Sequence, residues 1–403
     1  MSVLSGKKVL LGVTAGIAAY KTAFLVRILV KKGAEVRVVM TPSAKDFVTP
    51  LTLSTLSKNE VLSTFTSEED ENAQWNNHVE LGLWADLFII APATANSLSK
   101  MAQGTSDNLL IATYLSAKSP VYFAPAMDLD MYKHPSTVET FEKLQSYGNI
   151  LIPAAHGELA SGLVGEGRMA EPEAIVDFVE KDLASKLPLR NKKVLITAGP
   201  TYEAIDPVRF LGNHSSGKMG YAIAEAAAGM GASVILVSGP TSLHAEDPNI
   251  QLVHVRSAAE MYEAVHKEFK QCDIAILSAA VADYRPAIIA DQKIKKHEGT
   301  LTIQLEKTQD ILASLGAMKK DQILVGFALE TENELENAKS KLQKKNLDLI
   351  VLNSLNDPGA GFGGDTNKVT FITSNNKVIP FEVKSKAAVA DDLLQYIINE
   401  LHV

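Results

Sequence analysis

Small and hydroxyl-bearing residues recur in the first half of the chain, each time after an apolar run. Residues 12–16 read Gly-Val-Thr-Ala-Gly, residues 91–110 are rich in small and hydroxyl side chains, and residues 124–132 carry methionines. Loops at the carboxyl ends of parallel strands can closely approach a flat ring or a phosphate. We therefore expect these loops to converge on one cofactor crevice. The first loop alone is equally typical of a plain turn between strand and helix, because it lacks the G-x-G-x-x-G spacing.

Two other features of this half have both a structural and a functional interpretation. His78 lies in the segment NNHVELGLWADL, and a lone histidine is more often structural than catalytic. Residues 157–169 form a glycine-rich segment that contains Arg168. Such a segment is typical either of a surface loop or of a flap that closes on a substrate.

The second half places lysines at several points of an otherwise acidic chain. SSGK at residues 215–218 precedes an alanine-rich stretch, KIKK occupies residues 293–296, and Lys341 and Lys345 lie one helical turn apart. The G-x-x-x-x-G-K-[ST] spacing of nucleoside triphosphatases is absent. A dinucleotide-binding domain and a solvated charge patch are the alternatives for these features taken singly. Together the lysines predict a site for a triphosphate.

Buried strands must position these loops. Apolar runs at residues 8–13, 36–40, 87–91 and 120–124 alternate with helical patterns such as residues 20–32, which is typical of a parallel sheet covered by helices. The same strand–turn–helix order starts again at residue 192, after a polar, proline-containing linker at residues 182–191. We predict an α/β protein of two Rossmann-like or flavodoxin-like three-layer domains with mainly parallel sheets. Their expected bounds are residues 1–186 and 190–403.

Composition agrees with two globular domains in 403 residues. The net charge of −8 argues against a broad nucleic-acid-binding face, which needs a basic surface. The single cysteine, Cys272, excludes an intrachain disulfide and a cysteine-rich metal site. The first residues superficially resemble a signal peptide, but a first strand entering a glycine turn is the preferred interpretation. No apolar run reaches the ~18 residues of a membrane span, so we expect a cytoplasmic protein.

The motifs of the first half together resemble the flavin-dependent cysteine decarboxylases, and phosphopantothenoylcysteine decarboxylases in particular. They are VTAGIAAYK, His78 with Trp84-Ala-Asp86, the PATAN loop, residues 124–132 and GEGRM. The resemblance implies FMN, which oxidises the substrate thiol to a thioaldehyde before CO2 leaves, and which then reduces the enethiol. It implies that His78 is catalytic and that Met127 and Arg168 bind substrate. The matching FMN positions are Thr14, Ala15, Gly16, Ile17, Thr41, Ser43, Ala91, Pro92, Ala93, Thr94, Ser106 and Asn108.

Two residues depart from that family's pattern. Asp128 stands where an asparagine usually contacts the substrate carboxylate, and Ser161 stands where many members carry a proton-donating cysteine. An ordinary serine is a much poorer acid than a thiol, whose pKa is about 8.5. We hypothesise that the departures compensate each other and that a protonated Asp128 near the flap supplies the proton.

The motifs of the second half resemble the bacterial, CTP-using phosphopantothenate–cysteine ligases. They include NHSSGKMG, AAVADYR, KIKK and VGFALET, and residues 357–365 resemble a loop near the active site. The resemblance implies that an acyl-cytidylate forms with loss of pyrophosphate, and that the cysteine amine then displaces CMP. It assigns Lys293 to the first step and Asn213 to the second, with Mg²⁺ carried by the CTP phosphates and its protein ligands unknown. The matching CTP positions are Leu277, Ser278, Ala279, Asp283, Lys293, Gln309 (a proline in the family), Asp310, Ile311, Leu312, Phe327, Lys341 and Lys345.

The combined resemblance spans nearly the whole chain and predicts a bifunctional decarboxylase–ligase of coenzyme A biosynthesis. Its expected partners are 4'-phosphopantothenate, L-cysteine and CTP, without nucleic acid or membrane. The resemblance also implies self-association, with decarboxylase trimers, ligase dimers and a dodecamer of the whole chain. An active ligase joined to an impaired flavin-binding domain is the main alternative, and an NAD(P) oxidoreductase is disfavoured because no dinucleotide motif is present.

Overall fold

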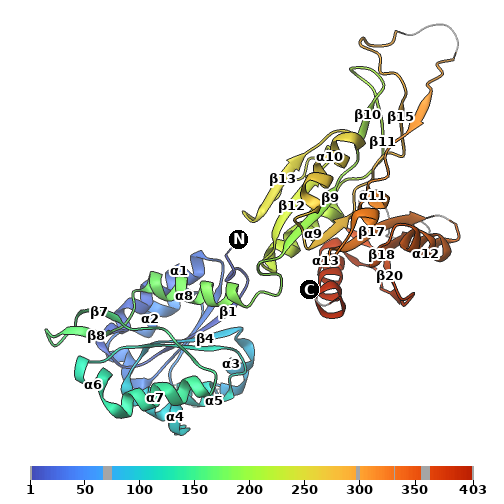
Figure 1. Cartoon of the computed structure of the whole chain (residues 1–403). Helices are drawn as coiled ribbons and strands as arrows, with labels where there is room; N and C mark the ends of the chain where they lie inside the picture. Colours follow the sequence, from blue (N-terminus) through green and yellow to red (C-terminus); the bar gives the residue numbers. More distant parts are fainter. Residues whose placement is uncertain (1, 67–74, 296–299, 331, 355–363, 402–403) are drawn as a thin grey trace. The chain divides into compact units, whose positions relative to one another are not determined.

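The computed structural model describes residues 2–66, 75–295, 300–330, 332–354 and 364–401. The chain divides into two compact units, Ser2–Ser185 and Lys186–Val403, which are described separately (Figure 1). Lys296 of the KIKK motif and residues 357–363 of the loop near the expected active site lie outside the described residues. In the described part of the chain, no helix is long and apolar enough to cross a membrane.

The N-terminal unit contains a parallel sheet with the strand order β3-β2-β1-β4-β5-β6. Its strands are β1 (Lys8–Val13), β2 (Glu35–Met40), β3 (Val61–Leu62), β4 (Leu87–Ala93), β5 (Val121–Pro125) and β6 (Ile150–Leu151). Val9 of β1 pairs with Val36 of β2 on one side and with Leu87 of β4 on the other. The strand order therefore reverses beside β1, and a ligand crevice is expected at the carboxyl ends of β1 and β4.

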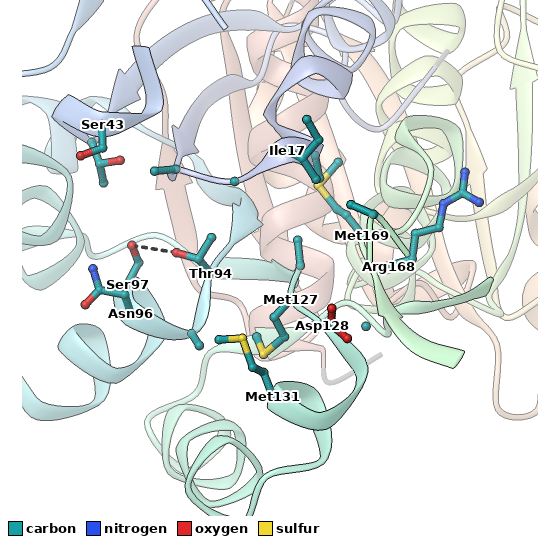
Figure 2. Close-up of a pocket in the computed structure, with 18 of the residues that line it drawn as sticks. Ile17, Ser43, Thr94, Asn96, Ser97, Met127, Asp128, Met131, Arg168 and Met169 are labelled. Carbon is teal, nitrogen blue, oxygen red and sulfur yellow. Dashed lines mark hydrogen bonds between the residues drawn. The ribbon is translucent and has the colours of Figure 1, made fainter. Parts of the chain in front are cut away.

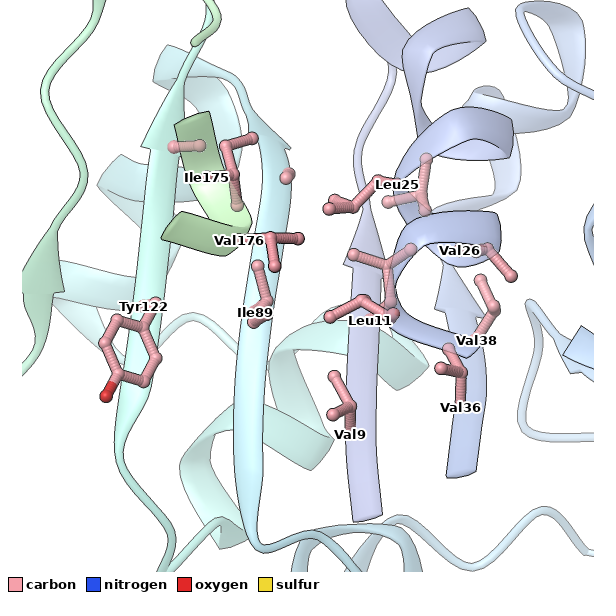
Figure 3. Close-up of a cluster of buried hydrophobic side chains, with 14 of the residues drawn as sticks. Val9, Leu11, Leu25, Val26, Val36, Val38, Ile89, Tyr122, Ile175 and Val176 are labelled. Atoms are coloured by element: carbon pink, nitrogen blue, oxygen red, sulfur yellow. The ribbon is translucent and has the colours of Figure 1, made fainter. Parts of the chain in front are cut away.

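Helices cover both faces of this sheet because its strands are apolar on both sides. Figure 3 shows Leu25 and Val26 of α1 (Thr22–Lys31) and Ile175 and Val176 of α8 (Pro172–Ser185) packed over one face. The other face lies under α3 (His78–Trp84), α4 (Ala95–Gln103), α5 (Leu109–Ser116) and α7 (Pro135–Ser146). Full burial of each large apolar side chain contributes about 1.5–3 kcal/mol. The remaining elements are η1 (Ile17–Lys21), η2 (Pro42–Asp46), α2 (Pro50–Ser57), α6 (Leu129–Lys133) and the antiparallel hairpin of β7 (Ala155–Glu158) and β8 (Val164–Arg168).

The C-terminal unit repeats this plan around an eight-stranded sheet of order β13-β12-β9-β14-β17-β18-β20-β21. Strands β13 to β18 in that order are parallel, and β20 and β21 are antiparallel additions. The strands are β9 (Lys193–Ala198), β12 (Ser233–Ser238), β13 (Ile250–His254), β14 (Ile274–Leu277), β17 (Ile323–Glu330), β18 (Leu349–Ser354), β20 (Val369–Thr373) and β21 (Val378–Pro380). The strand order reverses between β9 and β14, which again predicts a crevice at their carboxyl ends.

Helices α9 (Lys218–Gly229) and α13 (Lys386–Glu400) cover one face of this sheet. Helices α10 (Ala258–Phe269), α11 (Ile311–Met318) and α12 (Glu334–Lys344) cover the other face. Figure 1 shows the hairpin of β10 (Tyr202–Ala204) and β11 (Phe210–Gly212) beside β15 (Tyr284–Pro286), which pairs with β16 (Leu305–Lys307), in an arm that projects beyond the sheet. Strands β19 (Thr366–Asn367) and β22 (Lys384–Ser385) form a further short pair.

The predicted fold class is confirmed, the first strand has the predicted bounds, and the second begins one residue earlier than residues 36–40, at Glu35. Two other local predictions differ from the structure. The helix expected from Tyr20 begins at Thr22, because Ile17–Lys21 forms a 3-10 turn after Gly16. The linker expected from residue 182 begins later, because α8 continues to Ser185 and buries Ile175, Val176 and Val179 along its inner face.

Candidate functional site

A cavity of about 900 Å³ opens at the carboxyl ends of the N-terminal strands, where the strand order reverses (Figure 2). Its wall comes from η1, η2, the first turn of α4, the segment after β5, and the β7–β8 hairpin. A cavity of this size suits a cofactor or drug-sized ligand. The predicted residues that line it are Ala15, Gly16, Ile17, Thr41, Ser43, Thr94, Asn108, Met127, Asp128, Ser161 and Arg168.

Thr14 supports the wall of this cavity from behind. Its buried Oγ1 donates to the carbonyl of Pro92 at 2.7 Å and accepts from the Thr94 N–H at 3.1 Å. These bonds tie the turn after β1 to the PATAN loop after β4. Thr94 then begins α4 without capping it through its side chain, and the first turn of α4 lines the cavity. An uncapped first turn offers N–H donors to an anion.

Some polar groups of the cavity wall have a partner within the described part of the protein and others do not. The Oγ1 atom of Thr41 is buried in the wall after β2 and has no hydrogen-bond partner among the described residues. Leaving a buried hydroxyl unpaired costs free energy, so a ligand atom at this place would be stabilised. Lys100 is already paired with Asp107 at 2.5 Å.

Lys21 is almost completely buried, with its side chain 6% exposed, and its ammonium is fully engaged. It forms an ion pair with Glu171 at 2.9 Å and donates to the carbonyl of Met169 at 3.3 Å. Arg168 binds the same Glu171 oxygen at 2.7 Å. The hydrogen bond from Lys21, together with the charges of Lys21 and Arg168, holds the pKa of Glu171 below its usual range. This network anchors the base of the β7–β8 hairpin to η1.

The hairpin, which we call the flap (residues 155–168), packs closely against the segment after β5. The Met127 N–H donates to the carbonyl of Gly167 at 3.0 Å. Gly167 has φ +134°, and a Cβ there would lie 2.5 Å from the Met127 oxygen. A Cβ on Gly165 would lie equally close to a methyl group of Leu129. Glycine is therefore required at position 167, where the neighbour is backbone, whereas a Cβ at position 165 would displace the Leu129 side chain.

Asp128 lies where the flap meets this segment, as Figure 2 shows beside Met127. It caps α6 by accepting the N–H of Leu129 at 2.6 Å with Oδ1. Ser161, on the flap, lines the same cavity. The structure thus brings together the two residues that depart from the decarboxylase pattern.

His78 does not line this cavity. It begins α3, its ring meets the edge of Phe65 at 6.1 Å between centroids, and its buried Nδ1 has no partner among the described residues. Other predicted cofactor residues that do not line the cavity are Thr14, Ala91, Pro92, Ala93 and Ser106. Four of them are buried and support the cavity wall from behind, namely Thr14, Ala91, Pro92 and Ala93.

Several lining residues were missed in the sequence. They are Ala18, Tyr20, Lys21, Pro42, Ser97, Lys100, Ala126, Met131, Glu158, Leu159, Ala160, Gly167 and Met169. Ala18, Tyr20 and Lys21 belong to the quoted VTAGIAAYK motif, so the motif contained a signal for them. Ala95 and Asn96 of the PATAN loop and Asp107, between Ser106 and Asn108, were expected as FMN contacts and do line the cavity.

Two cavities open at the carboxyl ends of β9, β14 and β17 in the C-terminal unit. The larger one measures about 490 Å³ and the smaller one about 140 Å³, and Ala279 and Phe327 line both. The larger cavity contains most predicted CTP positions, namely Leu277, Ala279, Asp283, Gln309, Asp310, Ile311, Leu312, Phe327 and Lys345. Ser278 lines the smaller cavity.

Hydroxyl groups hold the loop after β14 in place. The Ala279 N–H donates to Thr197 Oγ1 at 3.1 Å, and the Thr308 hydroxyl donates to the carbonyl of Ala282 at 2.6 Å. At the floor of the larger cavity, Asp310 caps α11 and forms an ion pair with Lys345 at 2.9 Å. The cavity therefore has a fixed polar end, and two lysines, Lys307 and Lys345, line its wall.

The smaller cavity is built for a negative charge. It lies at the N-terminus of α9, where Gly217 has φ +79° and caps the helix without a side chain. Lys218 and Lys386 also line it, and Lys386 is buried and donates to the carbonyl of Gly364 at 2.5 Å. Burial, reinforced by the nearby charge of Lys218, lowers the pKa of Lys386. Lys218 already pairs with Asp365 at 2.6 Å, so the helix N-terminus and the Lys386 ammonium are the groups that would stabilise an anion here.

Asn213, Lys293 and Lys341 line neither cavity. Asn213 lies beside the smaller cavity and donates to the carbonyl of Ala280 at 3.0 Å. Lys293 is exposed on the arm, while Lys341 pairs with Glu330 at 2.5 Å. The described residues contain no cluster of acidic, histidine or cysteine side chains that could hold a metal ion by itself.

A buried carboxylate, that of Asp206, holds the backbone of Ile294, the residue after Lys293. The Ile294 N–H donates to Asp206 Oδ2 at 3.1 Å, and the guanidinium of Arg209 donates to the Ile294 carbonyl at 3.0 Å. Burial alone would raise the pKa of Asp206, but hydrogen bonds from the N–H groups of Val208, Ile294 and Arg209 lower it. Asp206 therefore fixes the backbone beside Lys293.

Comparisons with known proteins agree with this two-part architecture. Residues 2–184 match the family model described as Flavoprotein, and residues 189–401 match that of the DNA/pantothenate metabolism flavoprotein C-terminal domain. A solved C-terminal domain of a coenzyme A biosynthesis bifunctional protein CoaBC is 45% identical, with a TM-score of 0.47, and covers 54% of this chain and 98% of that chain. The FMN binding protein AtHal3 is 34% identical, with a TM-score of 0.39, and covers 45% of this chain and 98% of its own.

Full-length relatives are similar across both units. A protein named cysteine/cysteine sulfinic acid decarboxylase, from an unknown prokaryotic organism, is 55% identical over 88% of this chain and 100% of its own. The coenzyme A biosynthesis bifunctional protein CoaBC of Bacillus subtilis (strain 168) is 48% identical over 98% of this chain and 97% of its own. That of Escherichia coli (strain K12) is 45% identical over 94% of each chain. The chain belongs to the family of the coenzyme A biosynthesis bifunctional proteins CoaBC.

Proposed function

We propose that this protein catalyses two consecutive steps of coenzyme A biosynthesis. Its C-terminal unit, residues 190–403, joins L-cysteine to 4'-phosphopantothenate at the expense of CTP. Its N-terminal unit, residues 1–186, decarboxylates the resulting 4'-phosphopantothenoylcysteine to 4'-phosphopantetheine with FMN. The observation that carries the proposal is the presence of a separate cavity system at the reversal point of each sheet, lined by residues predicted for that reaction.

The large N-terminal cavity fits FMN. The unpaired Oγ1 of Thr41 offers a hydrogen bond to a hydroxyl-rich ligand, and the uncapped first turn of α4 offers N–H groups to a phosphate. Ile17, Met127 and Met131 supply apolar surface for a flat ring. Bound there, FMN supplies a two-electron oxidant and reductant beside the substrate thiol.

The side chains at the flap end of this cavity orient the substrate and supply the last proton. Arg168 is held by Glu171, so it presents a fixed cation at the flap base. Ser161 and Asp128 both line this end, and either hydroxyl or protonated carboxyl can donate a hydrogen. We propose that Asp128 is the donor for the acylated substrate, because a serine is the weaker acid.

The position of His78 outside this cavity supports a site completed by a second copy of the chain. Ile17, Tyr20 and Phe24 follow one another on η1 and α1 and are 62%, 52% and 60% exposed, although the first two line the cavity wall. Exposed apolar side chains in such a row are typical of a protein interface. We propose a homo-oligomer in which His78 of one copy approaches the cavity of another.

In the C-terminal unit, the larger cavity is proposed to hold the cytidine nucleotide. The first turn of α9 and the Lys386 ammonium are placed to stabilise phosphate or carboxylate oxygens. Mg²⁺ would arrive with the CTP phosphates and neutralise charge on them. Asn213 and Lys293, on or beside the arm, are proposed to act at this site from a second copy, since neither lines a cavity of its own chain.

One assay tests both activities. The purified protein receives 4'-phosphopantothenate, cysteine and CTP, and CMP, CO2 and reduced 4'-phosphopantetheine are measured. His78→Asn should stop CO2 release while CMP continues to form, and Lys293→Gln should block CMP while supplied 4'-phosphopantothenoylcysteine is still decarboxylated. CMP without CO2 in the unmodified protein would instead show a ligase joined to an impaired flavin-binding domain.

A second candidate concerns the N-terminal unit. Its relative of 55% identity is named for cysteine and cysteine sulfinic acid. Decarboxylation of an amino acid whose amine is free is favoured by one observation in this chain, the presence of a carboxylate at position 128 in the cavity wall.

A further inference from the structure

The cationic side chains around the N-terminal cavity are all paired with carboxylates, whereas some of the carboxylates there have no cationic partner in the part of the chain that the structure describes. Lys21 and Arg168 both bind Glu171, and Lys100 binds Asp107. All three cationic side chains of the wall are therefore engaged with carboxylates of the same chain.

Among the described residues, Asp128 and Glu158 are the wall carboxylates with no such partner, and of the two Asp128 is partly buried whereas Glu158 is exposed. Within the described part of the chain, no cationic side chain lies within 4.0 Å of the Asp128 carboxylate, and one of its oxygens accepts the Leu129 N–H. Figure 2 shows the guanidinium of Arg168 directed away from it. The carboxylate nevertheless lines the cavity at the end closed by the flap.

An uncompensated carboxylate in a partly enclosed wall favours a cationic ligand group. A thiol amino acid with a free amine carries such a group, the α-ammonium, whereas the amine of an N-acylated cysteine is a neutral amide. Both compounds carry an α-carboxylate, which an ionised Asp128 repels at short range, but only in the free amino acid does the adjacent ammonium offset this repulsion.

We propose that Asp128 is the residue that recognises the α-ammonium of a free β-thiol amino acid, so that the N-terminal unit decarboxylates cysteine itself. The inference rests on the proposed flavin-dependent decarboxylation. In the net reaction, the bond between the α-carbon and the carboxylate breaks, one proton is taken up, and cysteine gives CO2 and cysteamine without net oxidation. FMN bound in the cavity would supply the two-electron oxidation of the thiol-bearing carbon and the matching reduction of the enethiol, so no further oxidant is needed.

Binding without turnover separates recognition from chemistry. The full-length flavin-loaded protein is titrated with S-methyl-L-cysteine and with N-acetyl-S-methyl-L-cysteine, which differ at the amine and lack the free thiol. The free-amine ligand should bind about tenfold or more tightly, as expected for a charge-assisted hydrogen bond. Asp128→Asn should remove this preference. Asp130→Asn is the matched control, because Asp130 lies exposed on the same short helix and does not line the cavity.

Turnover gives a second readout. The KM for cysteine should rise about tenfold or more in Asp128→Asn relative to Asp130→Asn, whereas the KM for 4'-phosphopantothenoylcysteine should not rise in parallel, because loss of a proton donor lowers kcat instead. Equal binding of the two ligands by the unmodified protein, or an unchanged preference in Asp128→Asn, would overturn the inference. Release of CO2 from neither compound would overturn the proposed decarboxylase, while a binding preference lost in Asp128→Asn would still support Asp128 as the ammonium-binding residue.

Discussion

Replacing Gly167 by alanine should detach the flap from the segment that carries Met127 and Asp128. An added Cβ would lie 2.5 Å from the Met127 carbonyl oxygen, and φ +134° is a conformation that side chains rarely adopt. Such backbone strain costs about 1–3 kcal/mol. Moving the strand away would also break the 3.0 Å hydrogen bond from the Met127 N–H, which contributes about 1 kcal/mol.

The lower end of these values, about 2 kcal/mol, corresponds to a roughly 30-fold shift toward the detached flap. The matched control is Gly162→Ala at the flap tip, where φ is +84° but no atom lies within 4 Å of an added Cβ. Limited proteolysis within residues 155–168 and the KM for decarboxylation report flap docking, and thermal unfolding reports the core. Equal cleavage rates and KM values for the two variants would refute the argument that the close approach at Gly167 holds the flap in place.

Three further predictions concern single side chains. Glu171→Gln should destabilise the N-terminal unit by about 1 kcal/mol at pH 7, a value reduced because the Glu171 side chain is 48% exposed. The pKa of Glu171 is lower in the folded protein than in the unfolded chain. Its contribution to stability is therefore present above the unfolded-state pKa and is lost as the pH falls through the folded-state pKa, so the denaturation curves of the two proteins should converge in acid. Burial raises the pKa of Cys272 to about 12, so a disulfide reagent at pH 8 should label the native protein at least about 100-fold more slowly than the unfolded chain; equal rates would contradict its burial. Asp206→Asn should loosen the segment of Lys293 and lower CMP formation several-fold while CO2 release from supplied 4'-phosphopantothenoylcysteine is unchanged, and a parallel loss of both would contradict this positioning role.

The sheets could be predicted from the sequence because their strands are buried on both faces. Near-continuous apolar runs such as residues 8–13 leave little choice of structure, and β1 has these bounds. Ends of helices were less predictable. Pairing of Lys21 with Glu171 depends on a contact across 150 residues, so no local pattern shows that the turn before α1 is 3-10 and that this lysine is buried.

The candidate sites were predictable in residue type and less so in arrangement. Most of the CTP positions that the motifs indicate do line one cavity, because they follow neighbouring strands that end at one edge of the sheet. Lys341 and Lys345 show the limit of such reasoning. One helical turn separates them, yet Lys345 lines the cavity with Asp310 while Lys341 pairs with Glu330.

His78 and Lys293 match catalytic positions of the motifs, yet neither lines a cavity of its own unit. Both lie close in sequence to exposed apolar side chains. His78 is followed on α3 by Val79 and Leu83, which are 43% and 58% exposed, and Lys293 follows Ile288 and Ile289, which are 82% and 58% exposed. Large exposed apolar side chains raise the free energy of a solitary chain and lower it when another surface covers them. Association that covers these side chains would therefore carry His78 and Lys293 toward another copy, and the same burial that stabilises the assembly would complete both sites. A motif match in the sequence records which residue types the chemistry needs, whereas a residue supplied by a second copy would depend on surfaces that form only after the chain has folded.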